Sequence, residues 1–416
     1  ILSFTYAFIL NFINFDDISR YQKIIAESLT ISLASLPLLI HFFAVFQPLS
    51  VLLTAIFSVA FDTIMLPMLS IIFILSPLVK LTCFNGCFVF LETVIKHTKA
   101  ILGGPIVFGK PNLGILVLLF LMLGVLYDCW RRKKTAIFLV SLVALLFFQI
   151  KHPLENEVTV VDIGQGDSIF VRDVKGNTLL IDVGGKVSFS EKNAWQERLT
   201  DSNAERTLIP YLNSRGVGKI DQLVLTHTDT DHMGDMLEVA KQVKIGEILV
   251  SQGSLTKPDF VAKLQAMKTK VRVVTAGDVL PIMGSHLQVL YPSQTGDGGN
   301  NDSVVLYGNL LGKNFLFTGD LEEEGEQELI ATYPNLPVDV LKAGHHGSKG
   351  SSSSEFLAHI SPQIALISAG QNNRYKHPHQ ETLERFRVQN MTIYRTDEQG
   401  AIRFRGLNHW KIETVR

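Results

Sequence analysis

Apolar residues are concentrated in the first third of the chain. Runs of mostly apolar side chains cover residues 25–46, 48–81, 83–95, 113–130 and 135–150. Because a helix needs about 20 apolar residues to cross a bilayer, these runs predict an α-helical transmembrane bundle of roughly four to six spans over residues 1–152. The run 48–81 is too long for one straight span, so we expect it to break, tilt or re-enter at Pro67 and Pro77.

From residue 157 onward the pattern changes to short β-branched runs separated by turn residues. The predicted strands are 158–163, 168–173, 178–182, 222–226, 247–251, 271–275 and 288–291, followed by a hairpin of 303–309 and 314–318. Helical spacing intervenes at 206–214, 234–242, 259–268, 322–332, 354–359 and 380–389. This alternation predicts a layered α/β domain over residues 153–416, with its sites on the loops after the strands. The long connection 186–204 is expected to be a mobile flap.

Charge and cysteine usage separate the two parts further. Of the 38 basic and 39 acidic residues, 10 and 6 lie in residues 1–150, which leaves 28 basic and 33 acidic residues in 151–416. The resulting net charge of about −5 argues against a broad basic surface for duplex DNA, so nucleic-acid contacts should be local. Cys83, Cys87 and Cys129 all lie in the first part. The second part therefore has no thiolate zinc site, cysteine nucleophile or disulfide.

A basic loop predicts the orientation in the membrane. Arg131, Arg132, Lys133 and Lys134 separate the last two apolar runs, and basic loops of this kind stay cytoplasmic. The next span then leads outward, which places the α/β domain on the outer, extracytoplasmic side of the membrane. The chain begins with Ile and shows no signal peptide, so we expect it to be part of a longer protein.

The segment 226–232, Thr-His-Thr-Asp-Thr-Asp-His, is the sharpest candidate for chemistry. His227 and Asp229 occupy alternate positions that face the same side at the end of a predicted strand. Asp231 and His232 follow in the turn before a helix. Two imidazoles and two carboxylates at this spacing can bind two adjacent divalent cations. A helix-capping loop is the alternative, although capping does not explain both histidines.

Two later strand ends supply further ligands of the same type. The strand 314–318 runs through a glycine turn into Asp320, whose carboxylate can bridge two cations. Another strand, within 338–348, ends in His345 and His346 on a glycine-rich loop. Each segment alone is a weak signal, because a Gly-Asp turn is common and one of two adjacent histidines usually faces solvent. Their order and their placement at strand ends make the set specific.

This arrangement resembles the metallo-β-lactamase superfamily over roughly residues 157–405. The resemblance implies a four-layer αβ/βα sandwich with a dinuclear metal site. More narrowly, the segments 161–167, 300–303, 345–348 and 375–379 are similar to the extracellular domain of the ComEC family of DNA-uptake channels. That family's competence domain has proline-broken apolar spans like those found here, and its N-terminal part has no counterpart in this chain.

The motif departs from the usual superfamily pattern at two places. Asp229 replaces the second histidine of His-x-His-x-Asp-His, and Asn300 and Asn301 stand where a further histidine ligand is expected. ComEC-like sequences share these substitutions. The resulting oxygen-rich site favours hard cations such as Mn²⁺, while ligand type leaves Zn²⁺ open.

Hypothetical roles follow from the motif and the resemblance. One cation would be held by His227, Asp229 and Asp320, and the other by Asp231, His232, Asp320 and His346, with His345 as the alternative to His346. A water between the two cations would attack phosphorus. The catalytic candidates are Asp231, His345 and His377, the last of which would contact the phosphate or protonate the leaving oxygen. A solvent-facing loop histidine is an equal alternative for His377.

Supporting roles are more weakly indicated. Candidates for orienting the ligating histidines are Asp162, Gln165, Asp167 and Asp182, each of which is equally well an ordinary turn residue. The basic residues that flank the site are Lys342, Lys349, Arg374 and Lys376, and a solvated surface position is the simpler interpretation for each. The histidines taken as structural are His286, His359 and His409.

The resemblance implies a function in DNA internalisation during natural transformation. The membrane part would conduct single-stranded DNA, and the metal-dependent phosphodiesterase or nuclease domain would degrade the strand that is not imported. A DNA receptor and an import motor would then be partners. The alternatives are a domain that steers DNA without cutting it, and a hydrolase of small phosphodiesters or of a lactam. The intact ligand set favours catalysis.

Overall fold

The computed structural model describes residues 20–76, 85–101, 104–129, 132–186, 202–407 and 409–416. The chain folds into two compact units, Ile1–Ile150 and Lys151–Arg416. Most of the expected flap, 187–201, lies outside the described residues, as do Pro77 and the start of the basic loop.

The first unit is built from apolar helices. Its elements are α2 (Arg20–Phe43), β1 (Val45–Phe46), α3 (Ser50–Ala60), η1 (Phe61–Met65), α4 (Leu66–Leu75), α5 (Asn85–Ile101), β2 (Ile106–Val107), α6 (Leu113–Cys129) and α7 (Lys133–Lys151). The short strands β1 and β2 pair antiparallel. Among the described residues, two stretches have the length and apolar composition of a membrane span, Ile56–Leu75 and Lys133–Lys151. The larger number of spans stays a prediction.

The long apolar run does not break at Pro67, and its expected tilt or re-entry stays a prediction. Helical structure continues from Ser50 to Leu75, and Pro67 lies in the first turn of α4, directly after the π-helical turn η1. Pro lacks an N–H and would leave a carbonyl unpaired inside a regular α-helix. The wider turn of η1 changes the hydrogen-bond pattern at this point, with the N–H of Leu66 donating to the carbonyl of Phe61.

The second unit contains two mixed β-sheets. The eight-stranded sheet has the order β17-β16-β3-β4-β5-β6-β7-β8, and the seven-stranded sheet has the order β15-β14-β13-β12-β11-β10-β9. The strands of the first sheet are β3 (Asn156–Val160), β4 (Ile169–Arg172), β5 (Thr178–Ile181), β6 (Lys219–Val224), β7 (Lys244–Val250), β8 (Lys270–Val273), β16 (Ile402–Gly406) and β17 (Trp410–Thr414). Those of the second are β9 (Val279–Ile282), β10 (Ser285–Tyr291), β11 (Val305–Leu310), β12 (Lys313–Phe317), β13 (Val340–Lys342), β14 (Ile364–Ile367) and β15 (Thr392–Arg395).

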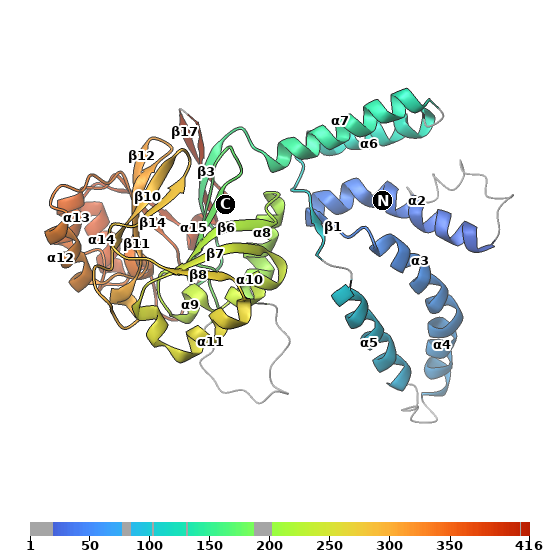
Figure 1. Ribbon diagram of the computed structural model, residues 1–416, viewed down its shortest axis with the longest axis horizontal. Coiled ribbons are helices and arrows are strands. Elements are labelled where there is room, and N and C mark those ends of the chain that lie inside the picture. Colours follow the sequence, from blue (N-terminus) through green and yellow to red (C-terminus); the bar gives the residue numbers. More distant parts are fainter. Residues whose placement is uncertain (1–19, 77–84, 102–103, 130–131, 187–201, 408) are drawn as a thin grey trace. The chain divides into compact units, whose positions relative to one another are not determined.

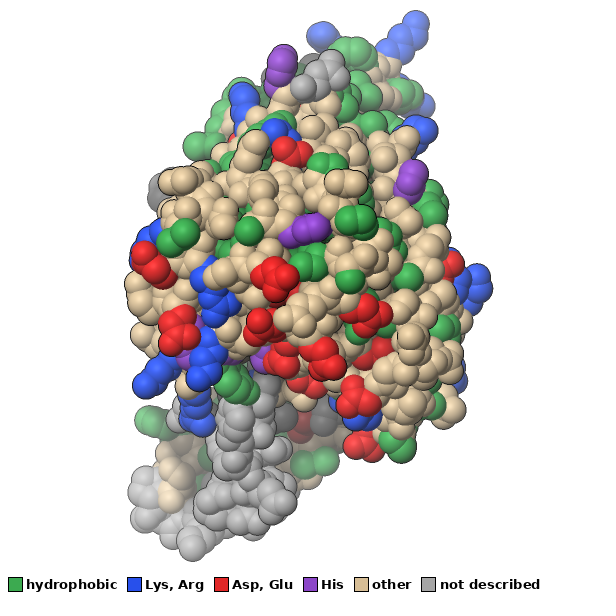
Figure 2. Space-filling model, turned by 90° about the vertical axis from the view of Figure 1, so that its left-hand side faces the viewer, with side chains coloured by type: hydrophobic (Ala, Val, Ile, Leu, Met, Phe, Trp, Pro, Cys, Tyr) green, Lys and Arg blue, Asp and Glu red, His purple; other side chains and the backbone are tan. Residues whose placement is uncertain are grey.

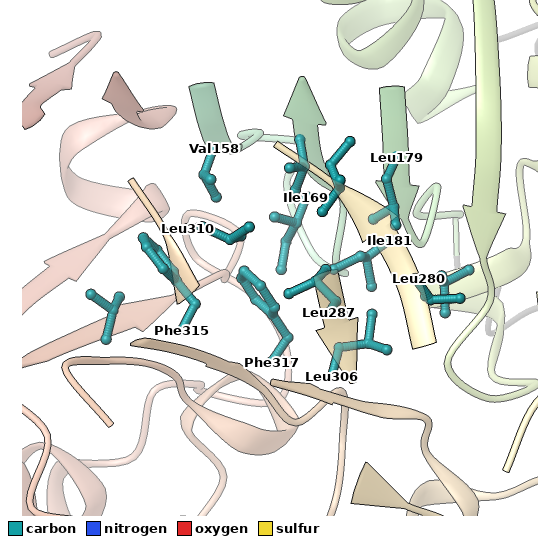
Figure 3. Close-up of a cluster of buried hydrophobic side chains, with 14 of the residues drawn as sticks. Val158, Ile169, Leu179, Ile181, Leu280, Leu287, Leu306, Leu310, Phe315 and Phe317 are labelled. Carbon is teal, nitrogen blue, oxygen red and sulfur yellow. The ribbon is translucent and has the colours of Figure 1, made fainter. Parts of the chain in front are cut away.

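The two sheets pack face to face and helices cover their outer faces (Figure 1). Between the sheets lies one apolar core, in which Val158 and Ile169 of the first sheet approach Leu306, Phe315 and Phe317 of the second (Figure 3). The helices and helical turns on the eight-stranded sheet are η3 (Ala204–Leu208), α8 (Ile209–Ser214), α9 (Thr230–Met233), α10 (Met236–Gln242), η4 (Gly253–Thr256) and α11 (Pro258–Met267). Those on the seven-stranded sheet are α12 (Glu323–Thr332), α13 (Ser354–Ile360) and α14 (Gln380–Val388). The remaining short helical turns are η5 (Asn300–Asp302), η6 (Gly344–Gly347) and α15 (Thr396–Gln399). This is the expected four-layer sandwich.

Parallel strand pairs bring the motif loops together. In one sheet β5, β6 and β7 run parallel, and in the other β12, β13, β14 and β15 do so. Loops after parallel neighbours emerge at the same edge of a sheet. The loops that follow β5, β6, β12, β13 and β14 therefore converge, and these are the loops that carry the candidate residues.

Candidate metal centre

The loop after β6 presents the first group of polar side chains. His227 is completely buried, whereas about half of the Asp229 side chain (54%) is exposed. Asp229 occupies the N-cap position of α9 but makes no capping hydrogen bond with its side chain. Capping alone therefore does not explain this carboxylate. Asp231 and His232 lie in the single turn of α9, and His232 is buried.

Hydrogen bonds fix the imidazole of His232. Its Nδ1–H donates to Oδ2 of Asp182 over 2.8 Å. Asp182 also accepts the backbone N–H of Thr226 at 2.8 Å and its hydroxyl at 2.7 Å, so the carboxylate is fully engaged. Burial raises the pKa of Asp182, while the neighbouring His232 acts to lower it. Because Nδ1 is the donor to Asp182, Nε2 is the nitrogen of His232 that faces the centre of the cluster.

His227 is held in a similar way by a hydroxyl. Its Nδ1 lies 3.1 Å from Oγ1 of Thr226, whose own proton goes to Asp182. Its Nε2 lies 3.8 Å from Oδ2 of Asp229 and is a buried atom without a hydrogen-bond partner among the described residues. Burial lowers the pKa of His227 to about 3, so this imidazole is neutral and its Nε2 lone pair is available to a cation.

The tight turn η6 directs two adjacent histidines in different directions. Both His345 and His346 adopt left-handed backbone angles, with φ of 46° and 54°. Such angles are costly for residues with a side chain, and they cluster at functional sites. His346 is buried and its Nδ1–H donates to the carbonyl of Ser368 at 3.0 Å. His345 is 26% exposed and its Nδ1 lies 3.1 Å from Oε1 of Glu322.

The inward-facing atoms lie within contact distance of one another. Nε2 of His232 is 3.3 Å from Nε2 of His346 and 3.1 Å from Oδ1 of Asp320. Nε2 of His346 is 3.3 Å from Oδ2 of Asp231 and 3.5 Å from Oδ2 of Asp320. Asp320 thus contacts histidines from the loops of both sheets, and its bridging role stays a prediction.

Electrostatics show that this cluster attracts positive charge. Burial alone would lower the pKa of His346, but Asp320 and Asp167 outweigh it and raise the value to about 10. Burial would raise the pKa of Asp320, yet His232 and His346 hold it well below its usual range. Burial likewise acts against ionisation of Asp231, but its hydrogen bond with His346 lowers the pKa to about 2. The carboxylates are therefore ionised and need compensation by protons or by cations.

The donor set fits divalent metal ions. Asp167, His232, Asp320 and His346 each place one ligand atom within 4.8 Å of the others. The buried Nε2 of His227 and the buried Oδ1 of Asp320 lack hydrogen-bond partners within the described part of the chain, although Oδ1 lies near His232. Unpaired lone pairs are costly inside a protein unless an ion or water satisfies them. Imidazole nitrogens combined with carboxylate oxygens are suitable ligands for transition-metal cations.

Asp167 is positioned differently from the other members of this group. Its Oδ1 lies 3.4 Å from Nδ1 of His346, on the side of the ring away from Nε2, and its Oδ2 lies 2.7 Å from Nζ of Lys342. Burial opposes its ionisation, but Lys342 and His346 keep its pKa below the usual value. We therefore interpret Asp167 as a residue that orients His346. A solvated surface position for Lys342 was wrong, because both members of this ion pair are buried.

His377 and Asn300 lie on the rim near His345. The ring of His377 is 5.4 Å from that of His345 and 6.3 Å from that of His346, and its buried Nδ1 has no hydrogen-bond partner among the described residues. Burial lowers the pKa of His377 to about 4. Nδ2 of Asn300 donates to Oε1 of Glu322 at 3.1 Å and lies 3.4 Å from Nδ1 of His345. The side chain at the expected third-histidine position thus faces the rim histidine.

Asp162 and Gln165, the other supporting candidates, make hydrogen bonds outside the histidine cluster. Asp162 pairs with Arg416 at 2.8 Å and accepts the N–H of Gly164, as a turn residue does. Oε1 of Gln165 is 3.4 Å from the N–H of Gly370. His286 and His359 are exposed and lie outside the cluster.

Sequence reasoning missed three supporting groups. These are the hydroxyl of Thr226, the carbonyl of Ser368 and the carboxylate of Glu322. Thr226 could have been found, because it lies inside the motif next to His227. The sequence contains no signal for Ser368, since any residue supplies a carbonyl and its position depends on β14 lying beside β13.

Comparisons with known proteins agree with this geometry. The model of the Metallo-beta-lactamase superfamily matches residues 161–371, and the model of the Competence protein family matches residues 2–133. The chain is 41% identical over 270 residues to ComE operon protein 3 of Bacillus subtilis, covering 64% of this chain and 35% of that protein. It is 35% identical over 266 residues to Competence protein ComA of Neisseria gonorrhoeae, covering 63% and 34%.

The chain thus spans about a third of the length of these curated relatives. Among solved structures, the metallo-beta-lactamase fold protein YhfI from Bacillus subtilis aligns with 60% of this chain and 100% of its own, at 11% identity and a TM-score of 0.40. The expected resemblance to competence proteins is confirmed by the matches over the first part of the chain and by the relatives. With a family match over half of its residues and an αβ/βα sandwich that brings the motif loops together, the chain belongs to the metallo-β-lactamase superfamily.

Proposed function

We propose that the second unit is a metal-dependent phosphodiesterase that cleaves DNA, and that the chain serves DNA internalisation during natural transformation. The observation that carries the proposal is the convergence of two buried imidazoles, His232 and His346, on the carboxylate of Asp320, with the buried imidazole of His227 beside that of His232. Each ring has its Nδ1 engaged by another group, which leaves Nε2 directed inward. The competence relatives supply the biological context.

The proposed ligand sets combine the motif residues with these contacts. His227, Asp229 and Asp320 would hold one cation, and Asp231, His232, Asp320 and His346 would hold the other. Two such cations would neutralise charge on the phosphate and activate a water near neutral pH. The oxygen-rich set that includes Asp229 favours Mn²⁺, with Zn²⁺ as the alternative.

The remaining residues position the substrate and handle its protons. Neutral His377 lies on the rim and can donate a hydrogen bond from its ring N–H to a phosphate oxygen. To protonate the leaving oxygen it would first have to take up a proton, which its lowered pKa opposes. His345 lies between His377 and Asp320 and can contact the same phosphate. Asp182 and Asp167 orient the two buried histidines, His232 and His346.

We further propose that the first unit is a multi-pass part of a channel for single-stranded DNA in the bacterial cytoplasmic membrane. The basic loop at 131–134 favours an extracytoplasmic position for the second unit. There it would degrade the strand that is not imported, while a DNA receptor and an import motor act before and after it. The apolar stretches Ile56–Leu75 and Lys133–Lys151 support the membrane part of this proposal.

Two other functions are compatible with the same fold. The second unit could bind and steer DNA without cleaving it, or it could hydrolyse small phosphodiesters. The buried, oriented ligand set favours catalysis over steering, because a steering domain has no need for an inward-facing imidazole cluster. The acidic net charge of residues 151–416 limits DNA contact to the region near the site.

The test is cleavage of labelled DNA by the detergent-solubilised chain. Single-stranded and duplex oligonucleotides are incubated with Mn²⁺, Mg²⁺ or Zn²⁺, with and without chelator, alongside Asp231→Asn and the control Asp259→Asn on the exposed surface of α11. We expect cleavage that requires metal and Asp231 and that Asp259→Asn leaves unchanged.

The alternatives have their own signatures in this experiment. DNA binding by the metal-loaded chain without cleavage would establish the steering role. Cleavage of bis(p-nitrophenyl) phosphate without cleavage of any oligonucleotide would establish a small phosphodiester as substrate. Equal activity of the chain and Asp231→Asn would overturn the assignment of the site.

A further inference from the structure

An exposed aromatic ring lies beside the buried cluster and has no role in the proposed chemistry. Tyr375 belongs to the loop between β14 and α14, and 39% of its side chain is exposed. Its ring lies nearly parallel to that of His377, with centroids 5.7 Å apart and an angle of 23°. His377 is in turn nearly parallel to His346, at 6.3 Å and 27°. The stacked rings of His346, His377 and Tyr375 thus form a row from the buried cluster to the surface.

The ring contacts place Tyr375 next to the candidate centre, two stacking contacts away from His346. Burial raises the pKa of Tyr375, and the carboxylates of Asp231 and Asp229 act in the same direction. With ring centroids 5.7 Å and 6.3 Å apart along this row, Tyr375 is near enough for a base of a strand whose phosphate contacts the cluster to reach it.

Hydrogen bonds and ring contacts hold His377, on whose ring Tyr375 stacks. Asn373 accepts the N–H of His377 through Oδ1 at 2.9 Å and donates to its carbonyl through Nδ2. The rings of His345 and His379 lie 5.4 Å and 5.1 Å from that of His377. A ring held from below in this way loses little conformational freedom when a flat ligand stacks on it.

Positive charge near the ring is local. Lys349, just after the His345-His346 turn, and Lys376 are exposed and form no ion pair among the described residues. Acidic side chains also gather near the centre of the face shown in Figure 2. The first turn of α12 itself carries Glu323 and Glu324. Phosphates are therefore attracted at a few positions around the site and not along a broad basic track.

We propose that Tyr375 is a stacking platform for the nucleobase next to the scissile phosphate, with Lys349 and Lys376 contacting the flanking phosphates. This inference rests on the proposed function. Every base has a flat face, so recognition of this kind tolerates any sequence. In a duplex the neighbouring bases already cover that face, and the platform therefore favours single strands and frayed strand ends.

The test combines variants of the full chain with an abasic substrate. Single-stranded oligonucleotides carry either a normal base or a tetrahydrofuran spacer at one defined position next to the cleavage site. Base-on-aromatic stacking predicts that Tyr375→Ala raises KM for the normal oligonucleotide about ten-fold at nearly constant kcat. Tyr375→Phe should keep the wild-type KM, because it retains the ring. On the abasic substrate the chain and Tyr375→Ala should have equal KM values.

A second readout does not depend on cleavage. An oligonucleotide with 2-aminopurine at the same position is titrated with the Asp231→Asn chain, and stacking on Tyr375 should quench its fluorescence. Tyr375→Ala in that background should abolish the quenching, and Tyr375→Phe should restore it. Quenching that persists in Tyr375→Ala, or an equal KM increase on normal and abasic substrates, would overturn the platform. Absence of cleavage by the chain itself would count against the proposed function alone.

Discussion

The two halves of the candidate metal centre differ in how their ligands are held. The inner half consists of His232, His346 and Asp320, all buried, and both imidazoles donate their Nδ1–H to a fixed oxygen. The outer half consists of His227 and Asp229. Here a hydroxyl holds the imidazole, the carboxylate is 54% exposed, and the two ligand atoms are 3.8 Å apart.

This difference predicts the order in which the two cations would bind. Pre-organised ligands lose little entropy on binding, and outer hydrogen bonds to ligating histidines strengthen metal binding. In the outer half, the side chain of Asp229 must first be ordered, at a cost in conformational entropy. We therefore expect the inner cation to bind first and tightly and the outer cation to exchange readily.

The largest effect should come from the residue shared by both halves. Asp320→Ala removes the only carboxylate that the proposed ligand sets have in common, so both cations should be lost and cleavage should fall at least about a thousand-fold, as for other groups that act as a unit. Metal content after dialysis and single-turnover cleavage measure this. Retention of two metals per chain would contradict the bridging role.

An adjacent pair of histidines provides a matched test of inner against rim positions. His346→Ala removes a buried ligand and should reduce cleavage about a hundred-fold or more, together with metal affinity. His345→Ala removes a partly exposed ring and should reduce cleavage about ten-fold while metal content stays constant. Both residues adopt left-handed backbone angles, which alanine leaves equally strained, so unfolding temperatures serve as the control for stability. The reverse order of effects would show that His345 is the ligand.

The groups that orient the ligands should contribute less than the ligands themselves. Asp182→Asn weakens the acceptor for Nδ1 of His232 and should lower metal affinity by about 10- to 100-fold, the range found for such outer hydrogen bonds. The matched variant is Asp221→Asn, whose carboxylate also supports a strand end through Thr178 but lies in a separate hydrogen-bond group. Equal metal affinities of the two variants, measured by competition with a chelator, would contradict the orienting role.

The smallest effect is expected in the outer half. Asp229→Ala removes an exposed carboxylate that water can replace, so affinity for one of the two cations should fall about ten-fold, close to 1.4 kcal/mol. Calorimetric titration should show an unchanged first binding step and a weaker second one. Weakening of both steps would show that the two halves are not independent.

Much of the fold could be predicted because its signals are local. The apolar runs indicate the helices of the first unit, and the alternation in 157–332 indicates most strands and helices of the second. Strands β9 and β14 to β17 were not predicted. Of these, β16 pairs antiparallel with β3, about 245 residues earlier, which closes the first sheet with the end of the chain.

The candidate ligands could be predicted for a similar reason. The residues of 227–232 lie within one short loop, and Asp320 and His346 each follow a strand with an apolar pattern. The backbone conformation at these positions, and so the direction of each side chain, was not predictable. The sequence HHG does not indicate which histidine turns inward, and the spacing around Pro67 suggests a break where a π-helical turn occurs instead.

The amino-acid sequence by itself determined the two-part organisation, the family resemblance and the chemical types of the ligands, because these depend on local composition and on spacing along the chain. Tertiary structure alone decided which atoms face one another. The burial of Lys342 against Asp167 and the bond from His346 to Ser368 both require the loops of separate strands to meet. Burial and orientation are properties of the packed sheets, so no segment read in isolation contains them.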